Sequence, residues 1–147
     1  MGSLNLSNSR KSKYMDAVTR ILFIYAKLHP KEGYCQGMNE IVALLYFCFT
    51  NQNTEYERRV SESDAYFCFE KVMTIVGYGN FSSNEMLAAR VQVFNDCIKK
   101  IDPKLHESLR NGKVDIKLFE MRWFMVYMLQ EFDINNSLLI WDGLLAS

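Results

Sequence analysis

A glutamine between two glycines is the residue whose type and setting point most directly to chemistry. Gln36 lies within residues 33–39, which separate a helical pattern from a strongly apolar one. The glycines Gly33 and Gly37 indicate a tight loop that presents the Gln36 side chain at a surface. A carboxamide is neither acid nor base, but it donates and accepts hydrogen bonds together, as orienting a water molecule requires. A surface glutamine near a helix start is the plain alternative.

Other catalytic patterns are missing from the sequence. There is no nucleophile elbow with a Ser/His pair, no GxxxxGK[ST] and no GxGxxG. The four cysteines lie far apart among apolar residues, so we expect buried free thiols in a reducing compartment. We expect no metal site, because only His29 and His106 could supplement the thiols as zinc ligands.

Composition limits the class of protein. The length of 147 residues fits one domain, and 49% hydrophobic residues are enough to build a core. Lys plus Arg equals Asp plus Glu at 17 each, which argues against a nucleic-acid or membrane-surface binder. The longest apolar run, residues 41–49, is too short for membrane insertion. Met1-Gly2-Ser3 resembles an expression scar, and we expect a cytoplasmic protein.

The elements that must position Gln36 are predicted to be helices. Apolar residues recur at helical spacing over residues 13–28, and residues 37–47 are apolar almost all round, which predicts a central helix. No strand-like alternation competes, so the prediction is an all-α bundle of six to seven helices after a flexible segment, residues 1–12. Further helix starts are expected at Ser61–Asp64, Ser82-x-x-Glu85, Asp102-Pro103, about Ile116 and Asn135 or Asn136.

Several blocks of this sequence resemble one family. Residues 34–39, Tyr-Cys-Gln-Gly-Met-Asn, resemble the YxQGMN motif of TBC domains, the all-helical modules of Rab GTPase-activating proteins. Residues 21–30 resemble the helix that leads into that motif. Residues 119–123, 131–132 and 139–142 are similar to later blocks of the family. Because the blocks occur in the family's order over residues 17–146, the match is far more specific than any single motif.

The resemblance implies a GTPase-activating domain that acts on Rab-family small GTPases. Gln36 would be the catalytic residue that positions the water attacking the γ-phosphate, and an arginine from an upstream IxxDxxR motif would neutralise the developing charge. Tyr34, Gly37 and Asn39 would lie at the partner-binding surface. The chain itself would hold no cofactor, since GTP and Mg²⁺ would belong to the partner. Localisation would be cytoplasmic, with recruitment to endomembranes through the GTPase.

The supporting residues leave alternatives open. Tyr34 is either a core aromatic or shapes the loop, and Asn39 is either a helix cap or a polar contact near the partner. Arg122 lies in an apolar pattern, so we expect a structural ion pair with Glu120, Glu131 or Asp142. Trp141 and Asp142 are expected to be architectural, an aromatic anchor beside a paired carboxylate.

The sequence departs from the family at the arginine. No IxxDxxR precedes residues 13–28, and Leu4-x-x-Ser7-x-x-Arg10 copies only its spacing, with serine in place of the acid. We therefore expect residues 13–147 to be the middle and later part of a TBC-like domain, truncated at both ends and inactive alone. Such a piece could form a homodimer. The alternatives are a non-catalytic TBC-like scaffold that binds a GTPase without stimulating it, and an unrelated helical adaptor.

Overall fold

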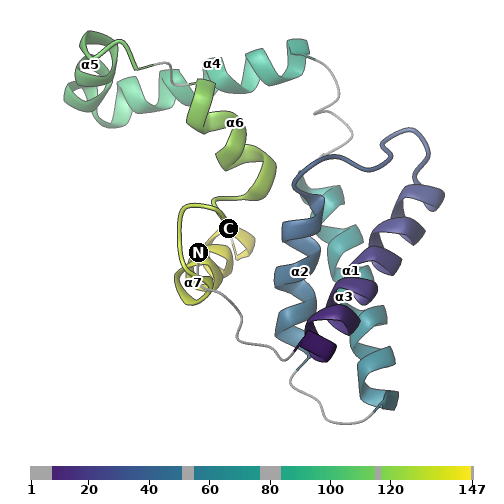
Figure 1. The fold of residues 1–147 in the computed structure, drawn as a ribbon. Coiled ribbons are helices and arrows are strands. Elements are labelled where there is room, and N and C mark those ends of the chain that lie inside the picture. The colour runs from purple at the N-terminus through teal and green to yellow at the C-terminus, as the bar shows by residue number, and fades with distance from the viewer. Residues whose placement is uncertain (1–7, 51–54, 77–83, 115–116, 147) are drawn as a thin grey trace.

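The regular structure of the chain is helical. The computed structural model describes residues 8–50, 55–76, 84–114 and 117–146. Within these ranges the helices and their bounds are α1 (Asn8–Leu28), α2 (Met38–Phe49), α3 (Glu55–Val76), α4 (Asn84–Ile101), α5 (Pro103–Asn111), α6 (Lys117–Val126) and α7 (Ile134–Leu145). This arrangement, drawn in Figure 1, confirms the predicted all-α class and the predicted number of helices.

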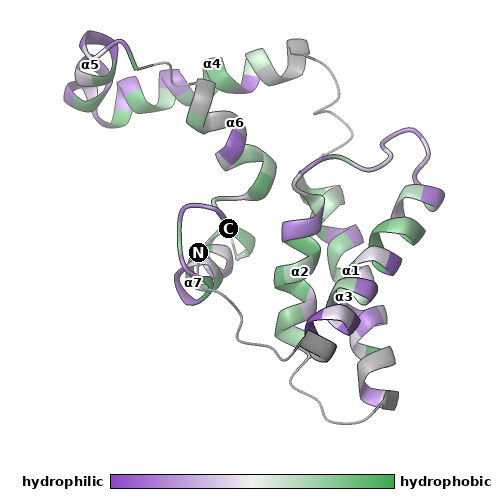
Figure 2. Cartoon of the chain, in the orientation of Figure 1, coloured by the Kyte–Doolittle hydropathy of each residue, from purple (hydrophilic) through white to green (hydrophobic). Residues whose placement is uncertain are grey.

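Helix α2 is the central element, as its apolar sequence predicts. It packs against α1, α3 and α6, and Figure 2 shows it apolar along most of its length. Its buried side chains are Met38, Ile41, Val42, Leu44 and Tyr46. Helices α1, α2 and α3 lie side by side, whereas α4 and α5 lie beyond α6 (Figure 1).

Helix α1 begins at Asn8 rather than near residue 13, so residues 8–12 belong to it. This stretch contains no Pro or Gly to interrupt a helix, and its Arg and Lys residues have good helix propensity. The predicted apolar face is largely correct, since Val18, Ile21 and Tyr25 are buried. Met15 is an exception and is half exposed.

Helix α3 begins before the expected N-cap. The prediction that a helix starts at Ser61–Asp64 is wrong, because α3 already begins at Glu55. The Ser61 hydroxyl instead donates to the carbonyl of Glu57 at 2.8 Å and lies 2.8 Å from the carbonyl of Phe49, so it joins α3 to the end of α2. Downstream the prediction is confirmed, since Ala65, Phe69, Val72 and Met73 are buried.

Helix α4 buries less than its pattern suggests. Val91, Phe94 and Ile98 are half-buried, and Ile101 is 84% exposed, so the expected core face is wrong at its end. The reason is that α4 packs mainly on α5 and α6 and not on the α1–α3 unit. Ser82 of the expected capping box lies outside the described residues.

The later helices follow local signals with two exceptions. Asp102 caps α5 by accepting from the backbone N–H of Leu105 at 2.9 Å, with Pro103 in the first turn, as predicted. Helix α6 ends at Val126, so the apolar pattern that runs on to Phe132 is not one helix. Asp133, and neither Asn135 nor Asn136, caps α7. Its carboxylate accepts from both asparagine N–H groups, and the bonds to Asn136 lower its pKa most.

None of the helices in the described ranges is long and apolar enough to cross a membrane.

Two phenylalanines on α3 offer a direct test of this packing. Phe69 is fully buried, and its ring lies edge-on to that of Tyr25 with centroids 4.8 Å apart. Phe67 on the same helix is 65% exposed. We expect Phe69→Ala to lower the free energy of unfolding by about 3 to 5 kcal/mol, because it leaves a cavity between α1 and α3. The control Phe67→Ala should change it by less than about 0.5 kcal/mol. Equal losses in denaturant unfolding would contradict the described core.

Candidate functional site

The connection between α1 and α2, residues 29–37, carries Gln36 and is here named the Gln36 loop. Two glycines give it its shape: Gly33 has φ 63° and Gly37 has φ 104°. Both values lie in the left-handed region, where a side chain is strained and glycine is not. Between them Gln36 is exposed, and its carboxamide makes no hydrogen bond within the described part of the chain. Its donors and its acceptor therefore face solvent.

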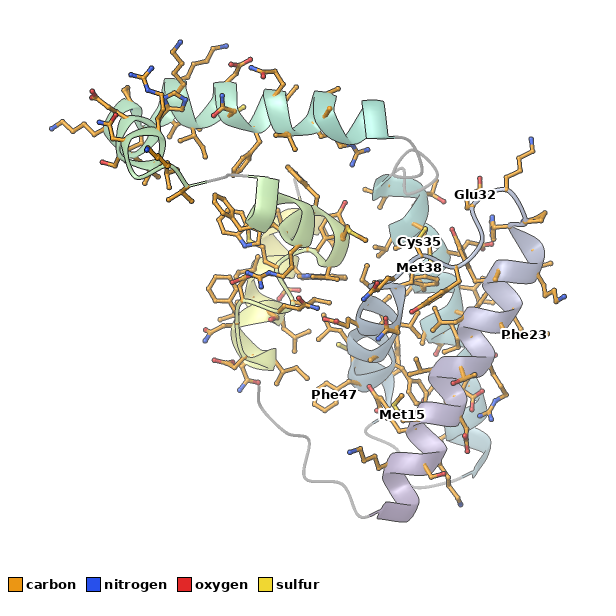
Figure 3. The ribbon with its side chains drawn as sticks, turned by 45° about the horizontal axis from the view of Figure 1, so that its top comes forward. Met15, Phe23, Glu32, Cys35, Met38 and Phe47 are labelled. Atoms are coloured by element: carbon orange, nitrogen blue, oxygen red, sulfur yellow. The ribbon has the colours of Figure 1, made fainter. Side chains whose placement is uncertain are left out.

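The loop is attached closely to the start of α2. Gly37 is the N-cap residue, and its carbonyl accepts from the N–H groups of Glu40 at 3.0 Å and Ile41 at 3.4 Å. The N–H of Cys35 lies 3.3 Å from Sδ of Met38, whose side chain is fully buried. Cys35 and Met38 are labelled in Figure 3, at the point where the loop meets α2. Gln36 thus projects from the end of the most buried helix.

Tyr34 and Asn39 form a polar bridge around Gln36. The Tyr34 hydroxyl donates to Oδ1 of Asn39 at 3.1 Å, so the residues that flank the glutamine on both sides are joined. Tyr34 is 53% exposed, which excludes the core-aromatic alternative. Asn39 lies within α2 and does not cap it, because Gly37 holds that position. Both side chains are exposed, as is that of Gln36 between them in the sequence.

A contact that the sequence does not signal lies next to this surface. Gln130 Nε2 donates to Oε1 of Glu40 at 2.6 Å, which joins the segment after α6 to the first turn of α2. The chain reaches this place through a turn in which Tyr127 and Met128 have φ 50° and 62°. Glu40 and Gln130 are far apart in the sequence, and no local pattern links them, so only the fold brings them together.

The three residues expected to give structural support lie in the helices on either side of that turn: Arg122 in α6, and Trp141 and Asp142 in α7. Arg122 pairs with Glu131, one of its three expected partners, at 2.7 Å. Trp141 is buried, and its Nε1 donates to the carbonyl of Tyr127 at 3.0 Å. Asp142 is exposed, and no cation among the described residues lies within ion-pair distance of it. Arg122 and Trp141 therefore hold the segment around that turn, as structural support requires.

The cysteines differ from the prediction. All four are free, but Cys48 and Cys97 are exposed, so the expectation of buried thiols is wrong for these two. Partial burial and then the Asp142 carboxylate raise the pKa of the Cys48 thiol. Among the side chains that the structure describes, no three His, Cys, Asp or Glu residues are arranged to hold a metal ion.

Comparison with known proteins shows the family of this chain. The model of the Rab-GTPase-TBC domain family matches residues 3–147. The chain belongs to the Rab-GTPase-TBC domain family. Residues 34–39, which resemble the family's YxQGMN motif, form the end of the Gln36 loop and the start of α2.

Relatives of the TBC family include full proteins that are much longer. The chain is 35% identical over 138 residues to TBC domain-containing protein C1952.17c of Schizosaccharomyces pombe, covering 90% of this chain and 22% of that protein. It is 35% identical over 139 residues to human TBC1 domain family member 13, covering 90% and 34%. Human TBC1 domain family member 22B is 24% identical over 136 residues, covering 84% and 27%. The chain thus spans about a third of these relatives' length at most.

Gly33 allows the loop's backbone requirement to be tested. A methyl group would meet nothing within 4 Å at Gly33 or at Gly143, which lies in α7, but only Gly33 has positive φ. Gly33→Ala should therefore destabilise the fold by about 1 to 2 kcal/mol through left-handed strain. The control Gly143→Ala should stabilise it by about 0.5 to 1 kcal/mol, since alanine is the better helix former. Thermal and denaturant unfolding measure both. Stabilisation by both substitutions would rule out the described loop conformation.

Proposed function

We propose that this chain supplies Gln36 to the active site of a Rab-family small GTPase and thereby accelerates GTP hydrolysis. The observation that carries the proposal is the exposed Gln36 carboxamide in the family's YxQGMN motif, held between two positive-φ glycines. The family makes a Rab GTPase the expected partner. A role in positioning water on that partner needs no acid, base or nucleophile, and the sequence has no pattern for one. GTP and Mg²⁺ reside on the partner.

The chemistry assigned to Gln36 uses both ends of its side chain. The carboxamide oxygen accepts a hydrogen bond from the attacking water, and the NH₂ group donates to an oxygen of the transferring phosphoryl group. Phosphoryl transfer needs little covalent help, so the gain comes from positioning and electrostatic stabilisation. Tyr34 and Asn39, both exposed, form the surrounding surface that meets the GTPase, and the buried Gly37 supports it by shaping the loop.

The charge that develops on the phosphoryl group needs a cation as well. Arginine fingers of this kind increase rates by about 10³ to 10⁵. The printed sequence has no IxxDxxR pattern, so we assign that role to a residue outside it. The action of the whole protein is expected in the cytoplasm, at the endomembranes where its Rab resides.

Single-turnover GTP hydrolysis across a panel of Rab proteins tests the role of Gln36. With the full-length protein, Gln36→Ala should reduce the stimulated rate by about 10²-fold or more, the loss typical of one removed transition-state hydrogen-bond donor. The control is Gln92→Ala, which changes another exposed glutamine, on α4, bonded to Asp96 at 3.2 Å. It should leave the rate unchanged. An unaltered rate for Gln36→Ala on every responsive Rab would remove Gln36 from the mechanism.

A second test compares the printed chain with the full-length protein on the same Rab. We expect the 147-residue chain alone to stimulate hydrolysis at least about 10³-fold less, because it lacks the charge-neutralising arginine. Binding to the GTP-bound Rab, measured by titration calorimetry, separates loss of catalysis from loss of contact. Equal stimulation by both proteins would contradict this expectation. Binding by the full-length protein without any stimulation would support the scaffold alternative.

A further inference from the structure

His29 lies where α1 ends and the Gln36 loop begins. Its backbone N–H donates to the backbone carbonyl of Tyr25 at 2.9 Å and continues the hydrogen bonding of α1. Its own carbonyl accepts from the N–H of Gly33 at 2.8 Å, which closes the first turn of the loop. The backbone of His29 therefore joins the rigid helix to the left-handed Gly33.

The His29 imidazole is held on two sides. Its ring stacks on that of Tyr25, with centroids 4.3 Å apart and planes inclined by 22°. Nε2 lies 3.1 Å from Oε1 of Glu70, which belongs to α3. Tyr25 is itself buried against Phe69, so the stacked face rests on the core. One contact is aromatic and the other polar, and together they fix both the position and the direction of the ring.

Glu70 is held in place independently of His29. The Tyr66 hydroxyl, one turn earlier on α3, donates to the same Oε1 of Glu70 at 3.2 Å. Burial and then the Glu70 carboxylate raise the pKa of Tyr66. Burial and then the carboxylates of Glu32 and Glu70 raise the pKa of Tyr25. Glu32, labelled in Figure 3, belongs to the Gln36 loop, so the loop passes close to this cluster.

We propose that His29 is a positioning residue, which ties the Gln36 loop to α3 through Glu70 and so restricts where Gln36 can reach. The inference deepens the proposed function and rests on it. At its other end the loop is fixed by Gly37 and Met38 on α2, as described above. Fixing both ends matters because the loop contains two glycines, and a misplacement of about 1 Å can cost about 10²-fold in rate.

The contact is partly accessible, with 32% of the His29 side chain and 37% of the Glu70 side chain exposed. The hydrophobic contacts of Tyr25 with Phe69 do not depend on it. Removing the imidazole should therefore loosen the loop more than it destabilises the helices. This difference separates a positioning role from a merely structural one.

The test uses the full-length protein with His29→Ala, His29→Gln and the control His106→Ala, which changes the other histidine, on α5. Two quantities are measured: kcat and KM for Rab·GTP hydrolysis, and hydrogen exchange of the Gly33 amide. His29→Ala should lower kcat about tenfold with KM changed less than about twofold, and should speed exchange at Gly33. His29→Gln keeps a donor for Glu70 and should restore most of kcat. His106→Ala should change neither quantity.

Each failure has a separate meaning. Unchanged exchange at Gly33 in His29→Ala overturns the tie to α3, whatever the hydrolysis rate. Faster exchange with unchanged kcat overturns the positioning role. Equal losses of kcat in His29→Ala and His29→Gln overturn the role of Glu70. A wild-type protein that stimulates no Rab overturns the proposed function, and exchange at Gly33 then decides the attachment of the loop by itself.

Discussion

The burial of α2 is the constraint on which the rest of the structure depends. A helix that is apolar nearly all round is stable only when other elements cover it on several sides. Helices α1, α3 and α6 provide this cover, and Trp141 of α7 joins the same core. The charged and amide side chains of α2, Asn39 and Glu40, both lie in its first turn, so this end of the helix is polar. The Gln36 loop enters α2 there, and burial thus decides where the loop can be exposed.

Polar contacts between α1 and its neighbours α2 and α3 add to the packing of these helices. Tyr14 of α1 donates its hydroxyl to the carbonyl of Ala43 in α2, and burial raises the pKa of this phenol. Arg20 pairs with Glu62 of α3, with Nε 3.0 Å from Oε2. This exposed pair contributes little stability by itself, but it is compatible with only one alignment of α1 along α3. The same alignment brings the end of α1 opposite Glu70.

The sequence was a good guide wherever a signal is local. The central helix, the Asp102-Pro103 start of α5 and the exposed loop at Gln36 could be predicted, because apolar spacing, capping and glycine act over a few residues. Roles near Gln36 rested on a family motif and not on spacing. For Tyr34 a core position and a role in shaping the loop were both open, and its exposed hydroxyl, bonded to Asn39, selects the second; the bond itself was not predicted.

The failures arise where tertiary contacts override local preference. Ser61 is a residue type that caps helices, but α3 extends past it toward the N-terminus. Its hydroxyl instead lies within hydrogen-bond distance of the Phe49 carbonyl at the end of α2. The apolar pattern after Val126 predicts a continued helix, but Tyr127 and Met128 have positive φ and the helix ends before them. The resulting contacts of Glu40 with Gln130 and of Tyr127 with Trp141 join distant segments, so no local pattern could reveal them.

The packing of α1, α2 and α3 on one another also bears on the order of folding. These helices are consecutive, so their contacts close short loops at low entropic cost. Such low contact order favours rapid assembly of a three-helix unit. Docking of Gln130 on Glu40 closes a much longer loop, with 90 positions between the two residues, and is expected to come later. The surface around Gln36 is therefore completed last, on a unit that has already formed beneath it.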